Sequence, residues 1–151
     1  MIDIIKEPND HVYSALISFA AARCKTFSLV WRNQLRFEVS AHEIAKMLEA
    51  DLVFRTTTNE WPGTQLIGNS AIVRYYNVTG RSMQVVQTVN RLYQWRSPSL
   101  PEDLAFYSSE SNCWMASISH EGDSWFEDES LTMEDILNSV PGIEIKIRDQ
   151  L

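Results

Sequence analysis

Apolar residues recur along this chain with two spacings, one of three to four residues and one of two. The first spacing is typical of helices with one buried face, and the second of half-buried strands. Helical spacing predicts helices over residues 10–23, 40–50, 82–95 and 133–139. Alternation, or a dense run of β-branched and aromatic residues, predicts strands over residues 25–31, 35–39, 53–57, 71–77, 104–107, 113–118, 124–127 and 143–148.

Local signals sharpen several of these boundaries. Ser40 and Glu43 have the spacing of a capping box at the start of the second helix, and Thr132 and Asp135 repeat that spacing before the last one. Asn33-Gln34 is predicted to turn the strand 25–31 back into the strand 35–39 as a hairpin. The order of elements lacks strict βαβ alternation and favours an α+β fold: one domain, residues 1–151, with a mostly antiparallel sheet and three to four helices.

The composition is that of a globular protein. The chain has 151 residues, 44% hydrophobic, which is enough for a core without disulfides. Cys24 and Cys113 are too few for a disulfide framework or a thiolate zinc site. The first residues lack the basic start and apolar run of a signal peptide, and no apolar run approaches the roughly 18 residues of a membrane helix. We therefore expect a cytoplasmic protein with no membrane association.

Charge is distributed unevenly along the chain. Residues 101–135 contain ten acidic side chains and no Lys or Arg, whereas residues 1–100 have eleven Lys and Arg against eight acids. The acidic residues of this segment are Glu102, Asp103, Glu110, Glu121, Asp123, Glu127, Asp128, Glu129, Glu134 and Asp135. One segment therefore accounts for the formal net charge of −7. Such a charge disfavours direct nucleic-acid binding, because it repels phosphate.

The same segment is rich in aromatic residues. Aromatic side chains ringed by charge are typical of protein interfaces, and clustered carboxylates steer basic partners. The alternative interpretation is that the aromatic residues face the core and the acids are solvated. Phe106 and Trp114 fit the core, and Glu134 and Asp135 fit the first turn of the last helix. The predicted partner-binding residues are those left unexplained: Glu121, Asp123, Trp125, Glu127, Asp128 and Glu129.

Other chemistry has weaker support. His120 lies beside Glu121 and Asp123, which could form a metal or acid–base site, but no HExxH or EF-hand spacing is present, and Gly122 favours a turn. We expect no metal and no cofactor, and, because no recognisable catalytic site is present, no enzyme. Thr79 to Ser82 precedes a helix and could hold an anion. Arg23 and Lys25 could lower the thiol pKa of Cys24, although a buried cysteine is the simpler interpretation.

Acidic and aromatic residues lie close together from Leu100 to Tyr107 and again in Trp125-Phe126-Glu127-Asp128-Glu129. With this stretch the chain resembles bacterial immunity proteins of toxin–immunity systems, including contact-dependent growth inhibition. The resemblance rests on size, charge and this acidic-aromatic stretch, not on a shared motif. It implies a one-to-one complex with a basic toxin domain, such as a nuclease, whose active site is blocked. A homodimeric structural or regulatory subunit is the third alternative, after the enzyme centred on His120.

Overall fold

A computed structural model describes residues 1–109 and 112–149. The fold is α+β, as predicted, and is built on one antiparallel eight-stranded sheet of order β10-β1-β9-β8-β7-β2-β6-β3. The strands of this sheet are β1 (Ile2–Ile4), β2 (Thr26–Arg32), β3 (Leu52–Thr58), β6 (Ala71–Asn77), β7 (Glu102–Ser109), β8 (Asn112–Ile118), β9 (Asp123–Phe126) and β10 (Ile145–Ile147). A separate small hairpin consists of β4 (Glu60–Trp61) and β5 (Thr64–Gln65).

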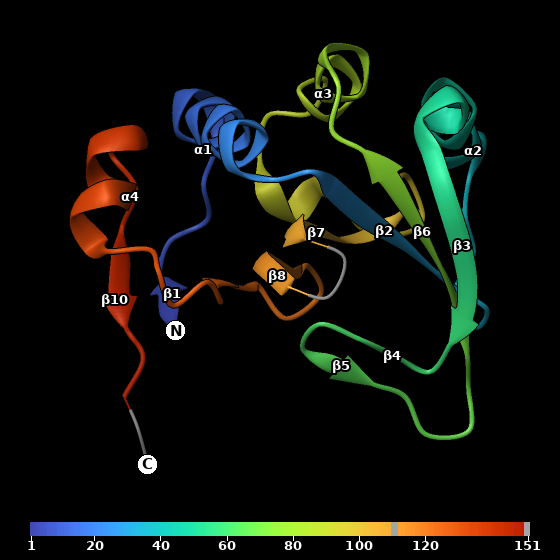
Figure 1. The fold of residues 1–151 in the computed structure, drawn as a ribbon. Helices are drawn as coiled ribbons and strands as arrows, with labels where there is room; N and C mark the ends of the chain where they lie inside the picture. The colour runs from blue at the N-terminus through green and yellow to red at the C-terminus, as the bar shows by residue number, and fades with distance from the viewer. Residues whose placement is uncertain (110–111, 150–151) are drawn as a thin grey trace.

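The helices are α1 (Asp10–Arg23), α2 (Val39–Leu48), α3 (Gly80–Val86) and α4 (Met133–Ser139), with short 3₁₀ turns η1 (Glu49–Asp51) and η2 (Leu92–Gln94). Figure 1 shows α1, α2 and α3 on one side of the sheet and the β4–β5 hairpin on the other. None of the helices in the described part of the chain is long and apolar enough to span a membrane.

The main core lies between the helices and the sheet. Leu16 and Ile17 of α1 are fully buried there, as are Phe27 of β2 and Phe106 of β7. Burial of each such side chain contributes roughly 1.5–3 kcal/mol. Because β2 and β7 are central strands, both of their faces are covered, and their residues do not show the polar alternation of an outer strand.

A smaller apolar layer covers the opposite face of the sheet. Trp61 of the hairpin packs there with Val30 and Val73. Gly63 forms the hairpin tip with φ +82°, and a Cβ at this position would lie 2.3 Å from the Trp125 ring. The tip therefore requires glycine, both for its backbone conformation and for its contact with Trp125.

The predicted strand over residues 35–39 is wrong. Both edges of β2 are occupied by strands from later in the sequence, β6 and β7, so no place remains for a hairpin partner. Phe37 instead packs beside Trp31, with ring centroids 4.7 Å apart. The N-cap of α2 is Glu38, and the Ser40 hydroxyl donates to the Ser99 carbonyl, 2.6 Å away, so the predicted Ser40 capping box is also wrong.

The predicted helix over residues 82–95 is too long. The helix ends at Val86, and the following segment pairs with the start of the chain. The Asp10 N–H donates to the Asn90 carbonyl, and the Leu92 N–H donates to the Pro8 carbonyl. Long-range pairing therefore overrides the local helical spacing. The predicted capping box of α4 is confirmed, with Thr132 and Asp135 bonded to each other's backbone N–H groups.

Candidate functional site

Two acids of the acidic segment are buried in the fold. Asp103 lies in β7 with φ +55° and is 1% exposed. Its carboxylate accepts hydrogen bonds from the Ser119 backbone N–H and from Trp61 Nε1, both at 3.0 Å. Arg32 Nη2 of β2 lies 3.5 Å away as its counter-charge. Asp103 therefore joins the hairpin, a central strand and the β8–β9 turn, and is not part of a free surface.

Glu102 is buried beside Asp103. One carboxylate oxygen accepts a hydrogen bond from the Ser97 N–H at 3.2 Å, and the other lies 2.5 Å from His120 Nε2. Burial raises the pKa of Glu102, the neighbouring charge of Asp103 raises it further, and His120 opposes both. The carboxylate partner of His120 is thus Glu102, rather than the predicted Glu121 or Asp123.

The predicted partner-binding residues divide into three places. Glu121 lies exposed in the β8–β9 turn, and Asp123 begins β9 with its side chain also exposed. Trp125 is buried in the middle of β9, under the hairpin tip. The last three residues, Glu127 to Glu129, follow β9 on its other end.

Arg148 partly neutralises one side of this region. Its guanidinium lies over the Trp125 ring, 5.3 Å from the centroid, and Nη2 is 2.5 Å from Asp3 Oδ1. The hydrogen bond from Arg148 to Asp3 raises the pKa of Arg148, and the charges of Asp3, Asp123 and Glu127 act in the same direction. Arg148 is not among the residues predicted for this site, although alternation in the last predicted strand places Lys146 and Arg148 on one face.

Trp125 positions an acid and is not itself a free anchor. It is 6% exposed, and its Nε1 donates to Glu127 Oε1 at 2.9 Å. With Arg148 over the ring and Gly63 against its edge, a partner would have to displace part of the fold to reach the indole.

The remaining acids line a surface hollow of about 400 Å³, which we call the acidic hollow. Its lining residues are Ser108, Asn112, Cys113, Glu127, Asp128 and Glu129. No Lys or Arg is among these lining residues, and in residues 1–109 and 112–149 no ion pair involves Glu127, Asp128 or Glu129. Asp128 is fixed by hydrogen bonds from the Ser130 N–H and hydroxyl, at 2.8 and 2.6 Å. An acidic lining of this kind suits a cationic side chain, which can pair with one of its carboxylates.

The acidic hollow is not preorganised for a metal. Over residues 1–109 and 112–149, no group of three or more His, Cys, Asp or Glu side chains has the arrangement needed to hold an ion. Cys113, which lines the hollow, has a raised pKa because it is largely buried and because Glu127 is close. Burial raises the pKa of Cys24 to about 12, so its flanking basic residues do not activate it. Both cysteines are free thiols.

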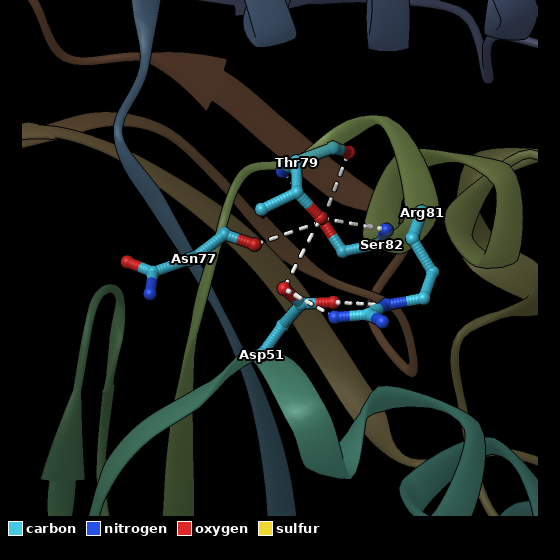
Figure 2. Close-up of polar contacts among 5 residues, drawn as sticks. All are labelled: Asp51, Asn77, Thr79, Arg81 and Ser82. Atoms are coloured by element: carbon cyan, nitrogen blue, oxygen red, sulfur yellow. Dashed lines mark hydrogen bonds and ion pairs between the residues drawn. The ribbon is translucent and has the colours of Figure 1, made fainter.

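The anion predicted before α3 is supplied by the protein itself. Figure 2 shows the Asp51 carboxylate in contact with both Thr79 and Arg81. The Asp51 carboxylate oxygens lie 3.2 Å from Thr79 Oγ1 and 3.3 Å from Arg81 Nε. Thr79 and Ser82 form a reciprocal capping box, and the Ser82 hydroxyl also donates to the Asn77 carbonyl. This cluster fastens the start of α3 to the end of η1, and we assign it a structural role.

Comparison with known proteins finds no match among protein-family models, curated proteins or solved structures.

Proposed function

We propose that this chain is a small acidic binding protein that neutralises a cationic protein partner, as a cytoplasmic immunity protein blocks a toxin domain. The observation that supports this most directly is the acidic hollow: Glu127, Asp128 and Glu129 all line it, and its lining residues include no Lys or Arg. Three like charges repel one another, and a basic side chain from a partner relieves that repulsion.

Electrostatics also sets the expected mode of binding. The side chains of Glu127 and Asp128 are half-buried and Glu129 is exposed, so a partner would desolvate the first two more completely than the third. Clustered charge of this kind mainly accelerates association and suppresses wrong partners. A nuclease domain fits this chemistry, because its phosphate-binding surface is basic.

A growth experiment tests the proposal. The C-terminal domain encoded by the reading frame beside this gene is expressed in cells with and without this protein. We expect the domain to arrest growth and wild-type protein to restore it. A neighbouring domain that is harmless, or that kills cells equally in the presence of this protein, contradicts the proposal.

The variant that tests the acidic hollow is Glu127→Gln/Asp128→Asn/Glu129→Gln. It removes three charges but keeps an oxygen that can accept from Trp125 Nε1 and from Ser130. The matched control, Glu43→Gln/Glu60→Gln/Glu144→Gln, removes three acids elsewhere. Among the described residues, Glu144 has an exposed ion pair with Lys6, and Glu43 and Glu60 have none. We expect protection to be lost with the first variant and kept with the second. Equal protection by both would show that the partner binds another face.

A further inference from the structure

The strand β3 forms one edge of the main sheet, and within residues 1–109 and 112–149 no strand pairs with its outer side. Six of its seven residues, from Leu52 to Thr57, are exposed, and Phe54 has a relative exposure of 53%. The opposite edge strand, β10, has only three residues. A β-bulge interrupts β3 between Leu52 and Phe54, but Phe54–Thr58 pairs regularly with β6. Edge strands of this length are usually shortened or covered, because their free N–H and C=O groups can pair with another strand.

The side of β3 that faces the helices has an excess of positive charge. Arg55 lies directly opposite Arg74 of β6 in the sheet register. Like charges in this position destabilise a strand pair. Together with Lys46 of α2 they line a hollow of about 390 Å³, whose one acidic lining residue is Glu49. We call this the basic hollow; its other lining residues are Ala45, Leu52 and Tyr76.

The cations of the basic hollow are available to a partner. None of Lys46, Arg55 and Arg74 is within ion-pair distance of an acid in the part of the chain that the structure describes. The guanidinium of Arg74 packs over the Trp31 ring, 4.9 Å from its centroid, and this contact holds Arg74 in place. The hollow therefore has at least one positioned guanidinium, which suits bidentate recognition of a carboxylate.

From these two features we infer that β3 is a docking edge for an acidic, extended segment of a partner protein, which adds a strand beside Phe54–Thr58. Alternate side chains of the added strand face the basic hollow, and their carboxylates meet Arg55, Arg74 and Lys46. The intervening side chains lie on the other face, next to the exposed Phe54. The Phe54 ring stacks on the Tyr75 ring, with centroids 4.4 Å apart. Main-chain hydrogen bonds supply affinity in this mode, and side-chain pockets supply specificity.

A second copy of this chain fits the edge poorly. Antiparallel pairing of β3 with itself would bring two basic hollows and two copies of Arg55 together. The acidic hollow lies across the sheet, at the end of β9, so the two surfaces are separate and either can fail its test without affecting the other.

A peptide experiment tests this inference on the full-length protein. The probe is a fluorescent peptide as long as β3, blocked at both ends, that alternates valine and glutamate; a second peptide has lysine in place of glutamate. We expect fluorescence anisotropy to show saturable binding of the glutamate peptide and none of the lysine peptide. No binding of the glutamate peptide up to about 1 mM, or equal binding of both, would overturn the inference.

Two further arms separate strand addition from simple charge attraction. Lys46→Gln/Arg55→Gln should weaken binding about tenfold, whereas Lys25→Gln/Arg36→Gln, which removes one exposed Lys and one exposed Arg elsewhere, should leave it unchanged. In an added strand, every second peptide N–H faces β3 and the others face away from it. N-methylation of the nitrogens that face β3 should abolish binding, whereas N-methylation of the other nitrogens should not. Equal effects of the two variants, or tolerance of both methylated sets, would overturn strand addition. A dimer in light scattering that Phe54→Lys dissociates would assign the edge to a second copy and also overturn it.

Discussion

The guanidinium of Arg148 lies over the ring of Trp125 and bonds to Asp3, so the residue directly after β10 supplies a cation to the region with the most acids. The predicted acidic surface is therefore smaller than the sequence suggests. Around Asp123 and Trp125 the charge is partly balanced within the chain, while the acidic hollow at the other end of β9 has no cation in its lining. This contrast supports the proposal that a partner binds at Glu127 to Glu129.

Removal of the Arg148 guanidinium should destabilise the fold modestly. Arg148→Gln loses the paired contact with Asp3 and the contact with the Trp125 ring, and we expect a loss of about 1–2 kcal/mol in the free energy of unfolding. Urea denaturation measures this loss. Lys146→Gln is the matched control, because its ion pair with Asp149 is exposed and should contribute less than about 0.5 kcal/mol. Equal losses in the free energy of unfolding for the two substitutions would show that the contacts of Arg148 with Trp125 and Asp3 do not stabilise the fold more than an exposed ion pair does.

The buried Asp103 should be among the most sensitive polar positions. Asp103→Asn leaves Arg32 without its counter-charge, and removal of one partner from a buried pair costs about 3–5 kcal/mol. Asparagine tolerates the positive φ at this position, so backbone strain does not contribute. We expect a large shift of the urea midpoint with an unchanged slope. A loss below about 1 kcal/mol would mean that Asp103 does not hold the hairpin to the sheet.

Glu102 should make stability depend on pH. Because its pKa is raised in the folded state, the folded protein binds this proton more tightly than the unfolded chain does. The associated stability is fully present below the usual carboxyl pKa of 4.5 and is lost as pH rises through the raised value. We therefore expect the unfolding free energy of wild type, relative to Glu102→Gln, to fall as pH rises from that range toward neutrality. Denaturation at several pH values and constant ionic strength measures this difference, and a pH-independent difference would contradict the assignment.

Both thiols should react slowly in the folded protein. With its pKa raised to about 12 by burial, Cys24 is almost entirely protonated at pH 8, and the pKa of Cys113 is raised as well. We expect native protein to resist a thiol-specific reagent at this pH and urea-unfolded protein to react at the rate of a free thiol. Rapid reaction of one thiol in native protein would reveal an opening of the structure near α1 or β8.

The fold class and most elements could be predicted from the sequence because they rest on local patterns. The spacing of apolar residues gives α1, and the Thr132–Asp135 pair gives the start of α4. The errors occur where distant segments decide the outcome. Strands β6 and β7 take both edges of β2 and exclude the predicted hairpin, while Pro8 and Asp10 bind the segment after Val86 and end the third helix.

The candidate site also depends on contacts between distant segments, which local sequence patterns do not reveal. Sequence charge alone does not distinguish Asp103, bonded to Trp61 and Ser119 from distant parts of the chain, from Glu129, which is exposed. Nor does it show that Arg55 and Arg74 face each other across two strands. Such pairings depend on the register of the sheet, which cannot be read from a single sequence.

The most direct test of the proposed function is the rate of association with the C-terminal domain that the neighbouring reading frame encodes. Stopped-flow fluorescence at low and at physiological salt measures that rate for wild type and for the neutral variant at Glu127, Asp128 and Glu129. We expect fast association of wild type that slows as salt rises, and slower association of the variant, at least about tenfold at low salt, with a weaker dependence on salt. Identical rates for wild type and variant at both salt concentrations would contradict the assignment of the acidic hollow as the binding site.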